Sequence, residues 1–453
     1  MNPFDTIAAT ATPVGEAGLA VIRISGQDAL AVADKCFEPV GKSSSKASAA
    51  KTHTIHYGNI VCDGRHIDEV LISVMRAPRT FTAEDTVEIT CHGGMLATRL
   101  VLESVLASGA RMAEPGEFSK RAFLNGRLDL VQAEAVADII HSRTELALVA
   151  ANEQLAGKLS RRIEELREDM LKILAHVEAH IDFPDEDISP DTKDQLIQRL
   201  VDGIDFMEQL LRHAKEGRIL REGIRAAIIG RPNAGKSSLL NELLGHERAI
   251  VSTIPGTTRD TIEETANIRG IPVIFIDTAG LRDSSDEIEQ EGIRRSHDAS
   301  EKAELVLHIL DHSEPLTDED RAHLTRFASE KRILVRNKID LEKRLELETE
   351  TTDVSCMTGD GIEALKDRIK DLVWSGDIKA ENLQLMVNAR HQNALMRAKE
   401  ATEKTVDALR MDIALELAAM DLRIAVNAVG EIVGKTSTED LLDKIFSQFC
   451  IGK

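Results

Sequence analysis

Residues 230–237 read GRPNAGKS and fit the pattern G-x-x-x-x-G-K-[ST]. The apolar run 224–229 before them predicts a strand, and residues 238–244, which read SLLNELL, predict a helix. In such a strand–loop–helix unit the glycines let backbone N–H groups surround phosphate oxygens. The lysine reaches the β- and γ-phosphates, and the hydroxyl ligates Mg²⁺. We therefore expect a nucleotide site in which Lys236 binds phosphate and Ser237 binds Mg²⁺.

A second segment, residues 430–436 with the sequence GEIVGKT, resembles this loop but has one spacer residue too few. A loop of that length does not form the same phosphate cradle. We expect the end of a helix with a glycine stop there.

An apolar run at 273–276 predicts a buried strand that leads into the motif D-x-x-G. The aspartate of this motif can hold Mg²⁺ through water, and the glycine N–H can sense the γ-phosphate. The motif consists of Asp277, Thr278, Ala279 and Gly280.

A further apolar run leads into the motif N-K-x-D, formed by Asn337, Lys338 and Asp340. A carboxylate at Asp340 can accept hydrogen bonds from guanine N1–H and N2–H₂, whereas adenine offers no such pair of donors. Ser355 and Cys356 fit a weaker base-contacting loop. The order and spacing of these motifs predict a P-loop domain of the Ras-like type that binds GTP.

Between the phosphate loop and the D-x-x-G motif, residues 256–260 read GTTRD, a polar switch in which a threonine can complete the Mg²⁺ shell. In many small GTPases the residue after the D-x-x-G glycine is a glutamine that orients the attacking water. Here that residue is Leu281. Hydrolysis is therefore slow, or a residue of the acidic segment 282–291 holds the water.

Length and charge limit the remaining possibilities. The 453 residues allow several domains, each with its own core. A net charge of −21 disfavours autonomous nucleic-acid binding, because most of the surface would repel phosphates. The five cysteines are scattered, and no apolar run reaches membrane-spanning length. We expect a cytoplasmic protein without a membrane span.

Three kinds of sequence pattern follow one another along the chain. Residues 1–118 mix short strand and helix patterns, which predicts an α+β domain. Helical periodicity dominates 119–218 and returns in 376–453, with the GTPase unit at 219–375 between them. Since neither helical segment can easily bury its apolar stripe alone, we expect one discontinuous helical bundle. The GTPase domain, a parallel-sheet α/β fold, would be inserted into this bundle.

The C-terminal residues 449–453 read FCIGK, which is unusually apolar for a chain end. They are either a docked tail or a segment that delivers Cys450 or Lys453 into a site.

Several distinctive segments occur in the same order as in one known family. They are ATPVGEAGL at 11–19, CHGG at 91–94, PGEFS at 115–119, RAFLNG at 121–126, IDFPDE at 181–186 and CIGK at 450–453. Together with GRPNAGKS, they resemble the bacterial tRNA-uridine-modifying GTPases known as MnmE or TrmE. These belong to the TrmE-Era-EngA-YihA-Septin-like GTPase superfamily. The resemblance spans essentially the whole chain.

The resemblance implies that the N-terminal domain mediates dimerisation and binds 5-formyl- or 5,10-methylenetetrahydrofolate as a one-carbon donor. Arg23, Glu88, Arg127 and Lys453 fall at the folate-contacting positions of the family. Cations suit the folate carboxylates, and a carboxylate suits the amino edge of the pterin. Some members have a lysine at the position of Arg127, so the geometry of that contact differs between members.

The resemblance also implies how the chain hydrolyses GTP without the glutamine. Dimerised GTPase domains would use K⁺, which neutralises charge that develops between the phosphates. The implied K⁺ ligands are Asn233, Ser252, Ile254 and Thr257. Thr258 would join Ser237 on Mg²⁺, and Glu289 would orient the water. Further nucleotide contacts are implied at Ala234, Gly235, Ser238 and Thr253. The implied catalytic residues are Glu289, Lys236, Asn233 and Cys450, whose chemical role stays open.

The implied function is a homodimeric, K⁺-dependent GTPase that works with the flavoprotein MnmG (GidA). The pair would install a carboxymethylaminomethyl or aminomethyl group at C5 of the wobble uridine, U34, of certain tRNAs. FAD would enter only through this partner, and tRNA would be contacted mainly by the complex.

Two other classes remain as alternatives. One is a ribosome-assembly GTPase of the Era or Der type, against which the folate-like domain and the CIGK tail argue. The other is a stand-alone folate-dependent aminomethyltransferase with a regulatory GTPase.

Overall fold

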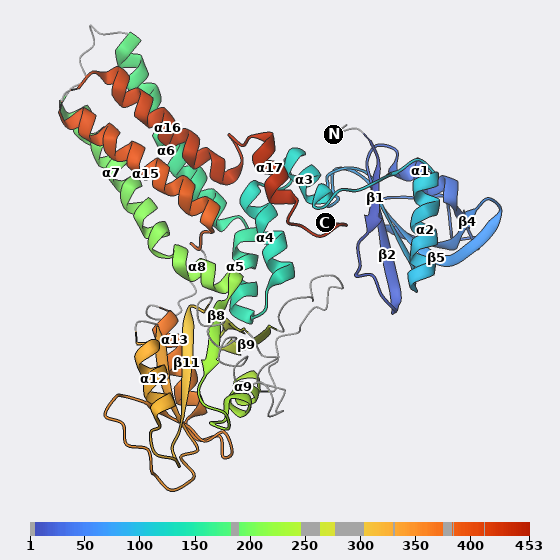
Figure 1. Cartoon of the computed structure of the whole chain (residues 1–453). Coiled ribbons are helices and arrows are strands. Elements are labelled where there is room, and N and C mark those ends of the chain that lie inside the picture. Colours follow the sequence, from blue (N-terminus) through green and yellow to red (C-terminus); the bar gives the residue numbers. More distant parts are fainter. Residues whose placement is uncertain are drawn as a thin grey trace. The chain divides into compact units, whose positions relative to one another are not determined.

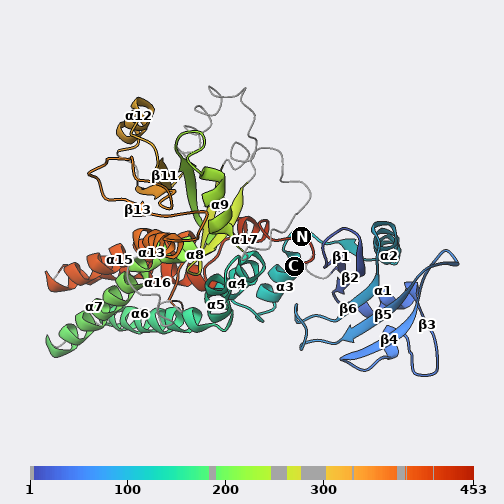
Figure 2. The ribbon, with the colours of Figure 1, turned by 90° about the horizontal axis from the view of Figure 1, so that it is seen from below.

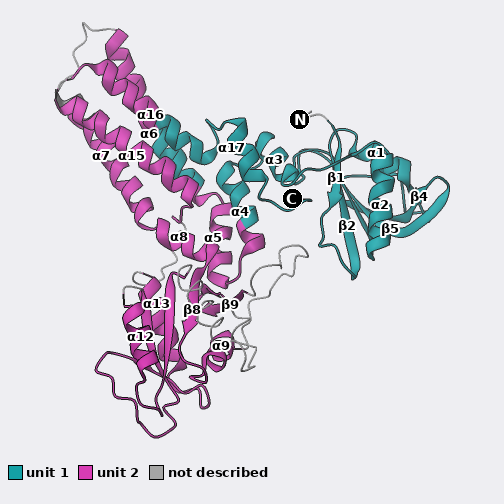
Figure 3. Ribbon diagram, viewed as in Figure 1, with its two compact units in different colours: residues 1–137, 160–168, 426–453 teal, residues 138–159, 169–425 magenta. Residues whose placement is uncertain are grey.

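The computed structural model of the chain describes residues 5–182, 190–245, 263–276, 303–328, 331–374, 383, 385–411 and 413–453. The chain forms two compact units (Figure 3). Unit 1 comprises residues 1–137, 160–168 and 426–453, and unit 2 comprises residues 138–159 and 169–425. The predicted domain limits are a different division of the chain and stay predictions.

Unit 1 contains a seven-stranded sheet in the order β3-β4-β5-β6-β2-β1-β7. Neighbouring strands are antiparallel, except that β1 pairs with β7 in parallel. The strands are β1 (Ile7–Thr10), β2 (Ala17–Ser25), β3 (Phe37–Pro39), β4 (Thr54–Cys62), β5 (Arg65–Met75), β6 (Thr86–Gly93) and β7 (Arg111–Met112).

Helices α1 (Ala29–Cys36) and α2 (Met95–Ala107) cover one face of this sheet, as Figure 1 shows. Strand residues alternate between the two faces, so those that point toward the helices form the core. Ile22, Ile72 and Ile89 on the sheet are fully buried together with Val101 on α2. A short 3-10 helix, η1 (Ala47–Ala49), lies in the long connection between β3 and β4.

The rest of unit 1 is helical. It contains α3 (Glu117–Leu124), most of α4 (Leu130–His141), α17 (Glu439–Phe446) and two further helical segments, residues 160–168 and 426–433. In the views of Figures 1 and 2 the C-terminus lies next to α3. The sequence-predicted glycine stop is confirmed, because α16 (Leu415–Val433) ends before Gly434, which has φ +88°. Its N–H donates to the carbonyl of Gly430 at 3.1 Å.

Unit 2 contains a six-stranded sheet in the order β13-β12-β11-β8-β10-β9. All neighbours are parallel except β10 and β9, which form an antiparallel hairpin. The strands are β8 (Ile224–Ile229), β9 (Glu264–Ile268), β10 (Ile271–Phe275), β11 (Leu305–Asp311), β12 (Arg332–Asn337) and β13 (Thr352–Asp353). The helices of this part are α8 (Ala214–Glu222), α9 (Lys236–Leu244), α12 (Asp318–Arg326) and α13 (Ile362–Val373).

The central strands read as nearly continuous apolar runs because helices cover both faces of a parallel sheet. Every residue of β11 is buried, for example. Leu239 of α9, Leu365 of α13 and Trp374 belong to the same core as Val273 and Leu307. The parallel sheet with its helices confirms the predicted α/β GTPase fold.

The long helices of unit 2 run alongside one another in Figures 1 and 2. They are α7 (Pro190–Arg212), α15 (Ala389–Arg410) and the parts of α6 (Lys158–Asp182) and α16 that belong to unit 2, chiefly residues 169–182 and 415–425. Helices from before and after the GTPase sheet pack together, as the Lys399–Glu208 ion pair between α15 and α7 illustrates. The predicted insertion needs the chain to enter and leave the GTPase part at neighbouring points. It does so, because a Cβ at Gly217 would lie 2.8 Å from the carbonyl oxygen of Val387.

Candidate functional site

The phosphate loop leaves β8 at Gly230 and enters α9 at Lys236. Gly230 has φ +146°, and a Cβ there would collide with the carbonyl oxygen of Ile309 on β11. Asn233 and Gly235 have φ +63° and +97°. Such left-handed turns before a helix expose successive backbone N–H groups, which is the geometry that binds phosphate oxygens.

The Lys236 side chain folds back over this loop. Its Nζ donates to the carbonyl oxygens of Gly230 and Arg231, both at 2.8 Å. Burial lowers the pKa of Lys236, and the charge of Glu319 partly opposes that shift. The charged amine therefore lies where the oxygens of a bound phosphate would compensate for its lost hydration.

Asn337 connects the phosphate loop to the base-recognition motif. It is 2 % exposed. Its Nδ2 donates to the carbonyl of Ala234 at 2.9 Å, and its Oδ1 accepts from the N–H of Cys356 at 3.3 Å. One buried amide thus joins three segments that are far apart in the sequence.

Asp340 stands exposed at the carboxyl end of β12. The Ser355 hydroxyl, itself fully buried, donates to Asp340 Oδ1 at 2.6 Å. This bond fixes the carboxylate while leaving acceptor capacity for a ligand. Burial, followed by the nearby charges of Glu242 and Asp340, raises the pKa of the Cys356 thiol to about 11, so this thiol is neutral at pH 7.

Lys338 has φ +67°, and its Nζ pairs with Asp311 Oδ2 at 2.6 Å. Burial alone would raise the pKa of Asp311, but hydrogen bonds from Lys338 and Ser313 outweigh it and lower that pKa. Asp311 ends β11, and the parallel β8 and β12 lie on either side of it. None of the sequence motifs includes Asp311, and its position at the end of a buried strand is the signal that the sequence offers for it.

Arg231 is a second residue that the motif did not predict. Its Nε pairs with Asp320 Oδ1 at 2.9 Å, and its Nη1 pairs with Glu314 at 3.1 Å. Asp320 is 2 % exposed and also forms the capping box of α12 with Thr317. The phosphate loop is thereby tied to the start of α12. The motif accepts any residue at this position, so it carries no such signal.

The structure therefore brings together the phosphate-loop residues and the base-recognition residues. They are Asn233, Ala234, Gly235, Lys236, Ser237 and Ser238 with Asn337, Lys338, Asp340, Ser355 and Cys356. Other predicted residues lie outside the described residues. They are Ser252, Thr253, Ile254, Thr257, Thr258, Asp277, Thr278, Ala279, Gly280 and Glu289.

A second cluster of predicted residues lies in unit 1. Arg23 and Glu88 are directly opposite each other on β2 and β6, and Arg23 Nε donates to Glu88 Oε1 at 2.8 Å. Arg23 Nη1 also donates to the carbonyl of Gly452 at 3.2 Å. Burial and the charge of Arg23 lower the pKa of Lys453, while Glu88 opposes the shift. The tail is thus docked, and its last residue lies within the electrostatic reach of this pair.

Aromatic rings complete the second cluster. The Arg23 guanidinium lies 5.6 Å from the Phe81 ring centroid and 5.7 Å from that of Phe118. Arg127 approaches the same Phe81 ring at 5.2 Å. All four predicted residues, Arg23, Glu88, Arg127 and Lys453, are therefore gathered around one place. Cys450 is exposed on the docked tail.

The parallel sheet, the phosphate loop and the guanine-directed aspartate define a P-loop GTPase. Two family models match: the MnmE helical domain over residues 130–450, and the GTP-binding protein TrmE N-terminus over residues 6–127. The chain belongs to the MnmE family of tRNA modification GTPases.

Curated relatives match over their full length. The chain is 46% identical over 465 residues to the tRNA modification GTPase MnmE of Geobacillus thermodenitrificans, with 100% of both chains covered. It is 45% identical to the protein of that name from Thermoanaerobacter pseudethanolicus, with 99% of this chain and 100% of the relative covered.

Solved structures match a part of the chain. A point variant of Aquifex aeolicus Era bound to GDP·AlF₄⁻ is 25% identical, covers 39% of this chain and 66% of its own, and has a TM-score of 0.26. The G domain of the T. maritima FeoB iron transporter is 28% identical, covers 33% of this chain and 99% of its own, and has a TM-score of 0.25. Within the residues that the structure describes, no helix is both long enough and apolar enough to cross a membrane.

Proposed function

We propose that the chain is a K⁺-dependent, dimerisation-activated GTPase that works with a flavoprotein of the MnmG (GidA) type. Together they would add a carboxymethylaminomethyl or aminomethyl group to C5 of the wobble uridine of certain tRNAs, with a tetrahydrofolate as one-carbon donor. One observation carries this proposal: a guanine-nucleotide site and the Arg23–Glu88–Lys453 cluster occur in the same chain. The full-length identity to relatives named tRNA modification GTPase MnmE supports the tRNA substrate.

Three residues of the nucleotide site support GTP binding, each in a different role. Lys236 is partly desolvated and bonded to loop carbonyls, and it would transfer these bonds to the β- and γ-phosphates. Asp340 would accept from the guanine N1–H and N2–H₂, held in orientation by Ser355. Asn337 keeps both halves of the site in register.

The residues present fit the two cations that the proposal requires. Ser237 is exposed in the first turn of α9, where its hydroxyl would hold Mg²⁺. Asn233 is exposed on the left-handed turn of the loop, where its side chain would hold K⁺. A bound K⁺ supplies positive charge against the charge that develops on the phosphates. Ser252, Ile254, Thr257 and Thr258 would supply further cation ligands, and Glu289 would orient the water.

The cluster in unit 1 supports binding of a folate. Glu88 suits the amino edge of a pterin, and Arg23, Arg127 and Lys453 suit its carboxylates. Phe81 and Phe118 offer apolar ring faces beside the guanidinium of Arg23. A folate carboxylate would share Arg23 with Glu88. Because Arg23 already pairs with Glu88 before the ligand binds, its contact with the carboxylate would add less to the affinity for folate.

The nucleotide state has a physical route to the helices. The β9–β10 hairpin joins the predicted switch segments, and it contacts the start of α5 (Glu145–Leu155). Arg143 Nη1 donates to Thr265 Oγ1 at 2.7 Å. A Cβ at Gly270 would collide with the Leu146 side chain, so the hairpin turn fits closely against α5. Movement of this hairpin during hydrolysis would therefore displace α5, which would gate the modification step.

Dimerisation is proposed through the exposed face of the unit 1 sheet. Ile55, Tyr57 and Leu71 present 66%, 40% and 43% of their surface on neighbouring strands β4 and β5. Grouped apolar side chains on a sheet face are typical of interfaces. The net charge of −21 supports the expectation that the flavoprotein supplies most of the tRNA contact.

The complete test reaction contains the purified protein, undermodified tRNA, GTP, a formyl- or methylene-tetrahydrofolate and the flavoprotein. In parallel reactions, each of these components is omitted in turn. Nucleosides are then analysed by mass spectrometry. We expect modified wobble uridine only when both proteins are present in K⁺. Modification by this chain alone would favour the aminomethyltransferase alternative. A product-free mixture, together with co-purification of ribosomal subunits, would favour the Era-type alternative.

A further inference from the structure

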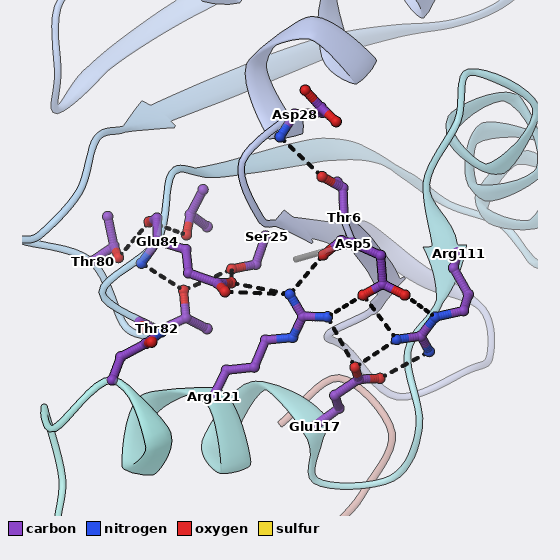
Figure 4. Close-up of polar contacts among 12 residues, drawn as sticks. Asp5, Thr6, Ser25, Asp28, Thr80, Thr82, Glu84, Arg111, Glu117 and Arg121 are labelled. Carbon is purple, nitrogen blue, oxygen red and sulfur yellow. Dashed lines mark hydrogen bonds and ion pairs between the residues drawn. The ribbon is translucent and has the colours of Figure 1, made fainter. Parts of the chain in front are cut away.

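Helix α3 is fixed to the unit 1 sheet by a network of ion pairs, which Figure 4 shows. Glu117 Oε1 accepts from Arg111 Nη2 at 2.7 Å, and Arg121 Nη2 pairs with Asp5 Oδ1 at 2.7 Å. Arg121 also reaches Glu84 at 3.3 Å. Arg121 is 5% exposed and Glu117 1%, so this network holds the helix at a defined position against β1 and β7.

The same helix contacts the C-terminal helix α17. Lys120 Nζ donates to Asp443 Oδ1 at 2.5 Å. The Phe123 and Phe446 ring centroids lie 6.4 Å apart. At the start of α3 the absence of a side chain on Gly116 admits the carbonyl of Phe446, with which a Cβ there would collide.

The tail beyond α17 then runs from α3 into the Arg23–Glu88 cluster. The Gly116 N–H donates to the carbonyl of Cys450 at 3.4 Å, and the Gly452 carbonyl accepts from Arg23 Nη1 at 3.2 Å. Gly452 has φ +96° and passes so close to β1 that a Cβ would collide with the carbonyl of Thr10. The end of the chain is therefore part of the wall of this cluster.

We propose that Lys120 and Asp443 are positioning residues that hold the C-terminal tail, residues 449–453, in the Arg23–Glu88 cluster. The tail mixes buried and exposed residues, because Phe449 and Gly452 are buried whereas Ile451 is 56% exposed. The direction of the tail is set by α17. The Lys120–Asp443 ion pair holds α17 to the fixed helix α3, together with the contacts of Phe446 with Phe123 and Gly116. Loss of the pair lets α17 shift, which withdraws the Gly452 carbonyl and Lys453 from Arg23 and Glu88.

The burial of the Lys120 side chain makes the pair specific. The Lys120 side chain is 9% exposed, whereas that of Asp443 is 61% exposed. Among the described residues, Asp443 is the partner that the structure assigns to the Lys120 ammonium. A largely desolvated ammonium that loses its carboxylate is unfavourable, so α17 has one preferred position on α3.

The test compares the Lys120→Met and Asp443→Asn variants of the full chain with the matched controls Lys444→Met and Asp440→Asn. The control residues are exposed on the same helix, α17. Hydrogen exchange of the C-terminal peptide 447–453 is the direct readout. We expect both pair variants to exchange there about tenfold faster, which corresponds to the loss of one charge-assisted hydrogen bond. Exchange of α2 in the pair variants, and exchange of the peptide 447–453 in the control variants, should match that of the unsubstituted chain.

In the double variant Lys120→Met, Asp443→Asn the peptide 447–453 should exchange no faster than in the single Lys120→Met variant. The Lys120→Arg variant keeps the positive charge, so its peptide should exchange as slowly as that of the unsubstituted chain. Unchanged exchange in Asp443→Asn, which leaves α3 intact, would overturn the proposal. Calorimetric titration with 5-formyltetrahydrofolate adds a functional readout that depends on the proposed folate site. We expect a Kd about tenfold higher for both pair variants, with K⁺-stimulated GTP hydrolysis unchanged. If the unsubstituted chain binds no folate, the folate proposal fails while the exchange result still decides the role of the pair.

Discussion

The side-chain amide of Asn337 donates a 2.9 Å hydrogen bond to the backbone carbonyl of Ala234. This bond joins the guanine-recognition motif to the phosphate loop. The adjacent Gly235 lies so close to this amide that a Cβ would collide with Asn337 Nδ2. The second glycine of the phosphate loop thus has two requirements, a left-handed backbone and room for the asparagine.

Replacement of Gly235 by alanine is expected to abolish tight nucleotide binding. The residue has φ +97°, and the methyl group would displace the buried Asn337 amide. Backbone strain and one lost buried hydrogen bond sum to about 3 kcal/mol, which corresponds to a loss of roughly 100-fold in GDP affinity. Titration with a fluorescent guanine nucleotide measures this. The control Gly15→Ala, where nothing lies within 4 Å of the added carbon, should bind normally.

Replacement of Asp340 by asparagine is expected to exchange the base preference. The carboxylate accepts two donors of guanine, whereas an amide presents one donor and one acceptor. Xanthine has a carbonyl oxygen in place of the guanine amino group and therefore suits the amide. We expect GDP affinity to fall at least about 100-fold, while xanthosine diphosphate binds more tightly than to the unsubstituted chain. Competition between the two nucleotides provides the measurement, and an unchanged preference would contradict the role of Asp340.

The elements around the nucleotide site were predictable because their signals are local. The apolar runs before Gly230 and Asn337 read as strands, and the structure has β8 and β12 there. The glycine stop at Gly434 was likewise local, since the chain needs a left-handed residue to leave the helix. The helical bundle followed from a physical argument, namely that neither apolar stripe can be buried alone.

Contacts between distant segments could not be predicted in the same way. Arg231 and Asp320 are separated by α9, the predicted switch segments and the strands β9, β10 and β11, and no recognised pattern specifies either residue. The Lys120–Asp443 pair joins two residues 323 positions apart. Such pairs depend on how two elements pack, which no local periodicity encodes. The sequence left two alternatives for the tail for the same reason. Its contacts with Arg23 and Gly116 show that it docks, and the docked tail also brings Lys453 to the Arg23–Glu88 pair, so a role in a site stays a prediction.

Hydrolysis is expected to depend on the alkali cation through Asn233. In K⁺ the unsubstituted chain should turn over GTP at least about tenfold faster than in Na⁺, because Na⁺ is too small for the same ligand set. GDP affinity should be nearly equal in both salts. Asn233→Ala should lose the K⁺ stimulation and retain GDP binding. Steady-state phosphate release in matched salts measures this, and equal rates in K⁺ and Na⁺ would remove Asn233 from its assigned role.

Signalling from the nucleotide to the helices is expected to pass through Arg143 and Leu146. Arg143→Ala removes the bond to Thr265, and Leu146→Ala removes the side chain that fills the turn at Gly270. We expect GTP hydrolysis to change less than about threefold, since neither side chain touches the nucleotide site. Modification of tRNA should fall by about tenfold. Parallel decreases in both activities would mean that these residues support only the folding of the GTPase sheet.

Stability of the GTPase core is expected to fall below pH 6.5 because of His308. This residue is fully buried on β11, and neither ring nitrogen has a hydrogen-bond partner among the described residues. Burial, together with the nearby charges of His323 and Arg332, lowers the pKa of His308 to about 4. In the unfolded chain histidine binds its proton near pH 6.5, so acid stabilises the unfolded state first. The loss begins near the unfolded pKa, is complete near pH 4 and amounts to at most about 3 kcal/mol. Trp374 is the single tryptophan and is buried in the core that includes Leu305 and Leu307 of β11, so its fluorescence during urea unfolding measures the effect. His308→Leu should flatten the dependence between pH 7 and pH 4, whereas a replacement of the exposed His66 should leave it unchanged.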